Sequence, residues 1–266
     1  MERRLYKAED HTWIVCAYGE SPYLEECIQS LKAQTIQSKI QIATSTPCEY
    51  ITRLAEKYGL EVFENHGEAG ICGDWNFALG TGKTELLTIA HQDDVYEPVY
   101  TWDLLKRMNH AKDPLIYFTN YGEIRNGEKV YSNRLLRIKR LLMVPTQLLP
   151  GVRTARRASL AFGNAICCPS ITYLKSVIGD NPFNDRFKSN LDWELTEKLS
   201  REDGRFIYNP RVVMYHRIHE ESTTTEIIGD HKRTQEDYEM MKKFWPDRIA
   251  RRLSKTYAAS EKSNLT

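Results

Sequence analysis

Short apolar runs alternate with amphipathic stretches along the first hundred residues. The run at residues 13–18 predicts a buried strand. Ser21 and Pro22 then open a segment whose apolar residues recur at the i, i+3, i+4, i+7 spacing of one helical face. These residues are Leu24, Cys27, Ile28 and Leu31. The pattern predicts a strand followed by a helix.

The same strand and helix pattern repeats before residue 91. Predicted strands lie near residues 40–42, 60–64 and 85–90, and predicted helices span 46–58 and 74–79. Gly59 is placed to end the first of these helices. Regular alternation of strand and helix indicates a mostly parallel sheet with helices on both faces. Farther along, Asn126 and Gly127 stand between two strand-like runs and predict a hairpin.

Two adjacent carboxylates, Asp93 and Asp94, follow the strand predicted at 85–90. Ligands in open α/β sheets bind at the carboxyl ends of strands. Divalent Mg²⁺ and Mn²⁺ take oxygen ligands from one or two carboxylates together with substrate phosphates. The pair therefore suggests a site for a metal and a diphosphate. The alternative is that both are solvated turn residues that cap the helix opened by Pro98.

The order of several segments resembles that of the family-2 inverting glycosyltransferases with the GT-A fold. The resemblance covers roughly residues 12–225, and the order of its parts is more specific than any one of them. The matching segments are Ala17-Tyr18-Gly19-Glu20, Tyr23 to Thr35, Gly73 to Leu79, Gln92-Asp93-Asp94, Leu191-Asp192-Trp193-Glu194-Leu195 and Tyr215 to Thr223.

This resemblance implies an α/β fold of the GT-A type, in which a Rossmann-like, mostly parallel central sheet has helices on both faces and a smaller acceptor-side region. It implies a single domain over residues 1–258. Within it we expect a nucleotide-binding half at 12–98, an acceptor and catalytic half at 99–225, and a C-terminal helical region at 226–258 followed by a tail at 259–266.

The resemblance also assigns roles to residues. Asp93 would face the ribose, Asp94 would hold Mn²⁺ or Mg²⁺, and Asp192 would be the catalytic base. His219 would lie near the metal and the diphosphate, and its alternative is an ordinary strand histidine. The other residues expected to bind the donor are Ala17, Tyr18, Glu20, Thr44 and Asn76. His91 and His216 are interpreted as structural neighbours.

Two positions depart from the family pattern. Thr44-Ser45-Thr46 stands where the family usually has an Asp that binds the nucleobase, and Gln92 occupies the first position of the Asp-X-Asp metal motif. The nucleobase is therefore less well specified than the rest of the donor. A UDP-sugar is expected because it is the commonest donor in the family that this chain resembles.

A helix is predicted to begin near Asn190. Leu191, Leu195 and Leu199 share one face of it, and Asp192 lies at the edge of that face, where it would border a cleft. In the first turn the helix dipole should keep its carboxylate ionised, as a proton acceptor requires. The alternative is an ordinary Asp of a first helical turn.

These roles imply transfer of a sugar from a nucleotide-diphosphate sugar to a hydroxyl of a saccharide or lipid-linked acceptor, in surface polysaccharide or glycoconjugate synthesis. Three other classes stay open. A metal-dependent hydrolase would use His91, Asp93 and Asp94, although its usual His spacings are absent. A sugar-nucleotide pyrophosphorylase would need a Gly-rich loop at 18–22, which this chain lacks. A non-catalytic sugar-binding protein would need neither Asp94 nor Asp192.

Composition favours a cytoplasmic enzyme. The chain has 266 residues, 41% of them hydrophobic, and a mean hydropathy of −0.55. No apolar run approaches the roughly 20 residues that span a bilayer, and residues 1–4 do not begin a secretory segment. The six cysteines show no zinc spacing or compact disulfide pattern, and we interpret them as reduced core residues.

Charge is strongly segregated, although the net charge is only +1. Residues 129–179 contain nine basic and no acidic side chains. At 134–144 basic and apolar residues are interleaved, which suits an interfacial segment on anionic lipid. We therefore expect peripheral contact with an anionic membrane through 134–157. The alternative is a helix packed on the core with a basic outer edge. A nucleic-acid partner is not expected, because no binding motif accompanies the charge.

Overall fold

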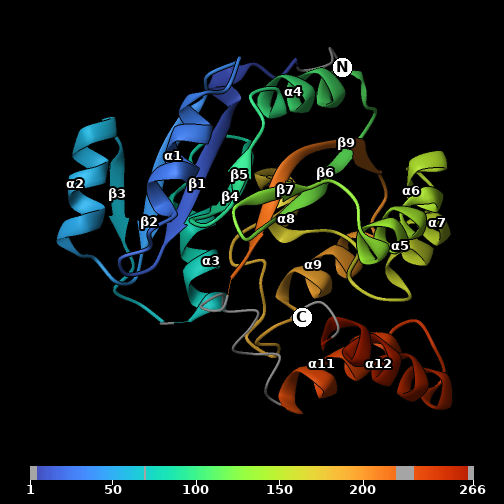
Figure 1. Ribbon diagram of the computed structural model, residues 1–266. Coiled ribbons are helices and arrows are strands. Elements are labelled where there is room, and N and C mark those ends of the chain that lie inside the picture. Colours follow the sequence, from blue (N-terminus) through green and yellow to red (C-terminus); the bar gives the residue numbers. More distant parts are fainter. Residues whose placement is uncertain (1–4, 69, 220–230, 263–266) are drawn as a thin grey trace.

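The computed structural model describes residues 5–68, 70–219 and 231–262, and its centre is a nine-stranded mixed sheet (Figure 1). The strand order is β3-β2-β1-β4-β8-β6-β9-β5, and β7 pairs with β6. The strands are β1 His11–Ala17, β2 Lys39–Thr44, β3 Glu61–Glu64, β4 Leu86–His91, β5 Val95–Tyr96, β6 Pro114–Arg125, β7 Glu128–Val130, β8 Ile171–Leu174 and β9 Arg205–Ile218.

Helices cover both faces of this sheet, as the alternating pattern predicts. They are α1 Leu24–Lys32, α2 Glu49–Tyr58, α3 Ile71–Thr81, α4 Tyr100–His110, α5 Arg134–Leu142, α6 Val144–Leu148, α7 Arg153–Leu160, α8 Lys175–Ile178, α9 Leu191–Leu199, α11 His231–Lys242 and α12 Asp247–Lys262. Within the described ranges, no helix combines the length and the apolar character needed to cross a bilayer.

Strand β1 shows how the two faces are filled. It pairs in parallel with β2 and β4, and successive side chains of a strand point to opposite faces. Trp13 and Val15 pack with Leu24 of α1 in one core cluster, whereas Ile14 packs with Leu79 of α3 in the other. The alternating strand and helix pattern of the first hundred residues therefore produces two hydrophobic layers on one sheet.

Several boundaries differ from the sequence expectation. Helix α1 begins at Leu24, so Ser21 and Pro22 lie before it instead of forming its first turn. Helix α3 is longer than the predicted 74–79. Gly59 ends α2 in the left-handed conformation as predicted, with a φ of 62°. The hairpin between β6 and β7 is confirmed, because Asn126 and Gly127 both have the positive φ that a tight turn of this hand requires.

The second half of the sheet is mixed in direction. Strand β8 runs antiparallel to β4 and β6, and β5 runs antiparallel to β9, while β6 and β9 are parallel. Helices α11 and α12 form a pair beneath α9 (Figure 1). This pair is fixed to the body where Trp245 Nε1 donates to the carbonyl oxygen of Ala161 at 2.6 Å.

Candidate active site

A cavity of about 540 Å³ opens at the carboxyl ends of β1, β2 and β4, the position expected for a ligand site in such a sheet. The structure brings six of the nine predicted site residues to its wall. These residues are Ala17, Tyr18, Thr44, Asp93, Asp192 and His219. The strand ends supply one wall and α9 supplies another, so residues a hundred positions apart face the same space.

Three predicted residues lie elsewhere. Glu20 is exposed and is not part of the cavity wall. Asn76 lines a neighbouring groove, where its side-chain amide donates to the carbonyl oxygen of Phe183 and accepts from the N–H of Phe183. Asp94 lies beneath the cavity wall with none of its surface exposed. One position before Asn76 in the same turn, Trp75 does line the cavity.

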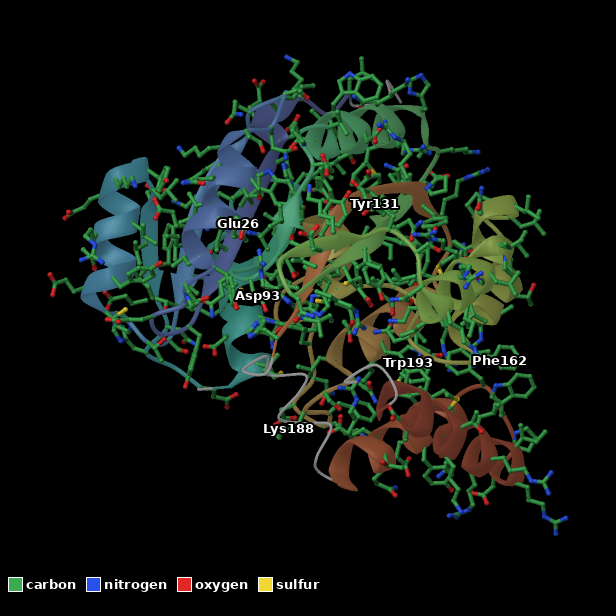
Figure 2. All side chains as sticks on the ribbon, in the orientation of Figure 1. Glu26, Asp93, Tyr131, Phe162, Lys188 and Trp193 are labelled. Atoms are coloured by element: carbon green, nitrogen blue, oxygen red, sulfur yellow. The ribbon has the colours of Figure 1, made fainter. Side chains whose placement is uncertain are left out.

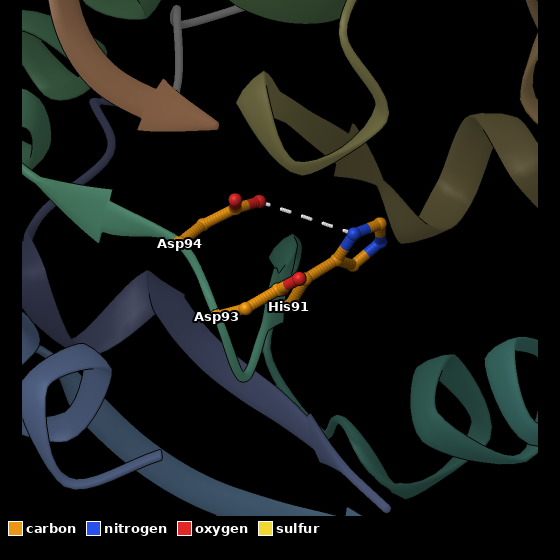
Figure 3. Close-up of side chains that lie close together, drawn as sticks. All are labelled: His91, Asp93 and Asp94. Atoms are coloured by element: carbon orange, nitrogen blue, oxygen red, sulfur yellow. Dashed lines mark ion pairs between the residues drawn. The ribbon is translucent and has the colours of Figure 1, made fainter. Parts of the chain in front are cut away.

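Asp94 connects the end of β4 to β9. Its Oδ1 accepts hydrogen bonds from Nδ1 of His216 at 2.9 Å and from the N–H of Arg217 at 3.0 Å. Its Oδ2 has no hydrogen-bond partner among the described residues and lies 3.9 Å from Nδ1 of His91 (Figure 3). Strand β9 therefore satisfies the hydrogen bonding of Oδ1 alone, and the buried Oδ2 remains available to a ligand.

The neighbouring charges shift two pKa values in opposite directions. Burial opposes protonation of His216, but the carboxylates of Asp94 and Asp93 outweigh it and raise the pKa of His216 to about 9. Burial also opposes ionisation of Asp93, but a hydrogen bond from His219 and the charges of His216 and His91 lower the pKa of Asp93 to about 2. At neutral pH the site thus holds an ionised Asp93 beside a cationic His216.

Arg217 fixes the turn that carries both aspartates. Its Nε donates to the carbonyl oxygen of Asp93 at 2.9 Å, and its Nη2 donates to the carboxylate of Glu26 on α1. The guanidinium carbon lies 4.4 Å from the centre of the Tyr23 ring. The sequence analysis gives Arg217 no role. The one feature of the sequence that marks this residue is its position between His216 and His219.

The side chains of His91, Asp93 and Asp94 form a cluster that fits a divalent cation. One ligand atom from each lies within 4.8 Å of the others, and Figure 3 shows the three side chains gathered at the end of β4. Oδ2 of Asp94 and Nε2 of His91 are buried without a hydrogen-bond partner among the described residues. Carboxylate oxygens with an imidazole nitrogen are suitable ligands for Mn²⁺ and, through the oxygens, for Mg²⁺.

His219 lies next to this cluster. Its Nε2 is 3.0 Å from Oδ2 of Asp93, and its ring centre is 5.0 Å from that of Tyr23. The histidine of the cluster of three is His91, which the sequence interpretation treated as a structural neighbour, and not His219. The ring of Trp75 stacks on His91 at 5.3 Å and fixes the imidazole at the cavity wall.

Asp192 occupies the first turn of α9, as predicted, and faces the cavity. Its Oδ2 accepts from Nδ2 of Asn164 at 2.7 Å, and its Oδ1 accepts from the N–H of Trp193 at 2.8 Å. Burial raises the pKa of Asp192 above its ordinary value, although these hydrogen bonds and the charges of Arg233 and His91 act in the opposite direction. The helix dipole is therefore not the main influence on this carboxylate, and burial makes it a stronger proton acceptor.

Three side chains of the basic stretch turn inward. Lys139 donates from Nζ to the hydroxyl of Tyr121 at 2.7 Å and lines the cavity. Arg157 pairs with Glu197 of α9. Arg156 is fully buried and its guanidinium donates to backbone carbonyl oxygens. The acceptors are those of Pro150, Ser200, Glu202 and Gly204. These three side chains therefore do not contribute charge to an outer face.

The chain resembles one known protein family and several solved structures. The family described as "Glycosyl transferase family 2" matches residues 12–179. No curated protein matches the chain. Residues 1–349 of TarS from S. aureus superpose with a TM-score of 0.63 at 16% identity, over 92% of this chain and 69% of that one.

Two further structures carry ligands. TarS 1–349 in complex with UDP-GlcNAc gives a TM-score of 0.60 at 17% identity, over 92% of this chain and 70% of that one. The mannosyltransferase PcManGT from Pyrobaculum calidifontis, in complex with GDP-Man and Mn²⁺, gives 0.63 at 15% identity, over 98% of this chain and 76% of that one. At these identities the likeness is one of fold.

Proposed function

The chain belongs to glycosyl transferase family 2, has the GT-A fold and is a glycosyltransferase; from this premise we propose that it performs metal-dependent, inverting transfer of a sugar from a nucleotide-diphosphate sugar to an acceptor hydroxyl. One observation carries the proposal: the acidic cluster at the end of β4 and the carboxylate of Asp192 line or underlie a single cavity. A donor diphosphate and an acceptor hydroxyl can therefore meet between them.

The donor side would hold Mn²⁺ or Mg²⁺ through Asp93, Asp94 and His91, and His219 would orient Asp93 through their hydrogen bond. Such a cation, when bound, neutralises the charge that develops on the leaving diphosphate. Ala17, Tyr18 and Thr44 would contact the nucleoside from the ends of β1 and β2. The predictions that Asp94 and His219 are direct ligands and that Asp93 faces the ribose stay predictions, and the unpaired Oδ2 of Asp94 supports the first of them.

Asp192 would accept the proton of the attacking hydroxyl. Its raised pKa improves its basicity, and the hydrogen bond from Asn164 fixes its orientation. A single displacement at the anomeric carbon inverts its configuration, so an α-linked donor gives a β-linked product. Burial shields this step from bulk water, which would otherwise compete with the acceptor.

The proposal extends to the donor and the acceptor. UDP-GlcNAc and GDP-Man are bound by two proteins of the same fold, which supports a nucleotide-sugar donor, and we favour a UDP-sugar. A saccharide or a lipid-linked saccharide at the cytoplasmic face of a membrane is the proposed acceptor, within surface polysaccharide or glycoconjugate synthesis.

Peripheral contact with an anionic membrane would use the outer face of α5 and α6, where Arg134, Arg137, Leu141 and Leu148 are exposed.

The test is a screen of nucleotide sugars with purified protein. Thermal stability is measured with UDP-, GDP-, CMP- and dTDP-sugars, each with Mn²⁺ and with EDTA, and release of the nucleotide is then followed. We expect Mn²⁺-dependent stabilisation by one class of donor and faster nucleotide release when saccharides are added. Release that saccharides never accelerate would identify a hydrolase, and the absence of both effects would leave only a binding protein of this fold.

A further inference from the structure

The C-terminal helices α11 and α12 are joined to the helix that carries Asp192. The carboxylate of Glu236 on α11 accepts from the backbone N–H groups of Lys188 at 2.7 Å, Ser189 at 2.8 Å and Asn190 at 3.2 Å. The next residue, Asp237, is fully buried and accepts from the side-chain amide of Asn190. These bonds tie α11 to the segment that opens α9, the helix on which Asp192 lies.

One side chain of α12 reaches from this pair to the cavity. The ring of Tyr257 lies directly over Gly163, where an added Cβ would stand 2.5 Å from Cε2 of the tyrosine. Its centre is 5.9 Å from that of the buried Trp193, which donates from Nε1 to the carbonyl oxygen of Leu160. Figure 2 shows Lys188 and Trp193 where the body meets these helices. Tyr257 is therefore held in place by packing on two sides.

Tyr257 lines the same cavity as Asp192 and Asn164. Gly163, on which the ring rests, directly precedes Asn164, and Asn164 donates to the carboxylate of Asp192. Arg233 of α11 also lines the cavity, and its charge lowers the pKa of Asp192. Tyr257 and Arg233 thus belong to the catalytic wall of the cavity, while the strand ends form the donor wall.

The acceptor must place a hydroxyl against Asp192, so its sugar ring must occupy the space that this wall borders. We propose that Tyr257 is an acceptor-binding residue, against whose ring a pyranose packs through its apolar C–H face, and that this chain selects a saccharide acceptor through its C-terminal helices. An amphipathic aromatic ring provides rigid apolar surface beside polar groups, which suits a sugar. The inference rests on the proposed function, and Tyr257 lies outside the segment that the family matches.

The experiment separates acceptor binding from donor binding. Full-length protein is loaded with Mn²⁺ and UDP, or with the nucleotide that the screen identifies, and a panel of methyl glycosides and disaccharides is titrated by saturation-transfer NMR. Tyr257→Ala should weaken binding of the saccharide about tenfold, which corresponds to about 1.4 kcal/mol. Nucleotide affinity should remain within about twofold of wild type, because the donor wall is untouched.

Three further variants make the result specific. Tyr257→Phe retains the ring and should bind the saccharide as the wild type does. Tyr257→Leu retains apolar volume without a ring, should bind about as weakly as Tyr257→Ala, and replaces that variant if it does not fold. Ile249→Ala, at an exposed position of the same helix, is the matched control and should bind normally.

Three results would overturn the proposal: unchanged saccharide binding in the Ala and Leu variants, an equal loss of nucleotide affinity, or a wild type that binds nucleotide but no saccharide of the panel. Failure of the wild type to bind any nucleotide sugar would overturn the proposed function itself, and the two failures are thereby distinguished.

Discussion

The donor wall of the cavity is assembled from the ends of adjacent strands, whereas the catalytic wall is held together by polar contacts between distant segments. On the donor wall, Ala17 and Thr44 are register partners at the ends of β1 and β2. On the catalytic wall, Asn164 bonds Asp192, and Glu236 caps the segment before α9. The arrangement of the donor wall follows directly from sheet topology. The arrangement of the catalytic wall depends on individual side chains, and removal of one of them should alter the site.

Replacement of Asp192 tests the chemistry of the catalytic wall and should give the largest effect. Asp192→Asn retains the size and the contact with Asn164 but removes the proton acceptor. Turnover should fall by about 10² to 10⁴-fold, while nucleotide binding, measured calorimetrically, stays unchanged. In the wild type, activity should fall as the pH drops through the raised pKa of Asp192, since only the carboxylate accepts a proton. An equal loss of nucleotide affinity would remove Asp192 from the catalytic role.

Replacement of Arg156 tests how the catalytic wall is supported. Its buried guanidinium satisfies carbonyl oxygens at the end of α9, so Arg156→Ala leaves several of them unpaired. The free energy of unfolding, from urea titration, should fall by about 3–5 kcal/mol. Arg153→Ala on the same helix is the control, because its pair with Asp203 is exposed and should contribute under about 1 kcal/mol. A loss no larger than the control's would show that Arg156 does not hold α7 to α9.

Asp94 lies beneath the cavity wall and bonds the end of β4 to β9, so its replacement should affect both stability and metal binding. Although it follows the end of a strand, Asp94 is fully buried against the cationic His216. In EDTA, Asp94→Asn should lower the free energy of unfolding by about 3 kcal/mol. Asp93→Asn, at the cavity wall, should cost less than half of that, and both variants should lose stabilisation by Mn²⁺ with nucleotide. Equal stability of the two variants in EDTA would contradict this distinction.

The contrast between the walls also explains what the sequence could predict. The 3.6-residue and strand periodicities locate β1 to β4 and α1 to α3, and parallel topology then places Ala17, Thr44 and Asp93 together. Partners on distant segments leave no periodic signal, so the burial of Asp94 against His216 and the turn of Asn76 toward Phe183 were not foreseen. Arg156 and Lys139 were counted as surface charge because composition does not record which way a side chain points.

His11 on β1 titrates away from either wall of the cavity. Both ring nitrogens contact hydroxyls, those of Ser38 and Thr88, and burial lowers the pKa of His11 to about 3. The unfolded chain takes up a proton below about pH 6.5 and the folded chain does not, so stability is present above that pH and declines below it. At pH 5.0 the loss should be about 2 kcal/mol. His11→Gln, compared by urea titration at pH 7.5 and 5.0, should lack this part of the decline, and an identical decline would remove His11 as its source.

The smallest predicted effect concerns the outer face of α5 and α6, which belongs to neither wall. Lys139 and Arg156 turn inward, whereas Arg134 and Arg137 are exposed on α5, as is Leu141, whose exposed fraction is 70%. Each cation near an anionic bilayer contributes about 1 kcal/mol. Arg134→Gln with Arg137→Gln should therefore weaken binding to phosphatidylserine vesicles about 30-fold at low salt, as measured by co-sedimentation.

The matched control is Lys32→Gln with Arg53→Gln, which removes the same charge from α1 and α2 on the other side of the molecule (Figure 1). Those substitutions should leave vesicle binding nearly unchanged, because charges beyond a Debye length of about 10 Å from the lipid are screened. Equal losses in both double variants would mean that net charge alone attracts the protein. A wild type that does not bind anionic vesicles even at low salt would rule out the membrane contact.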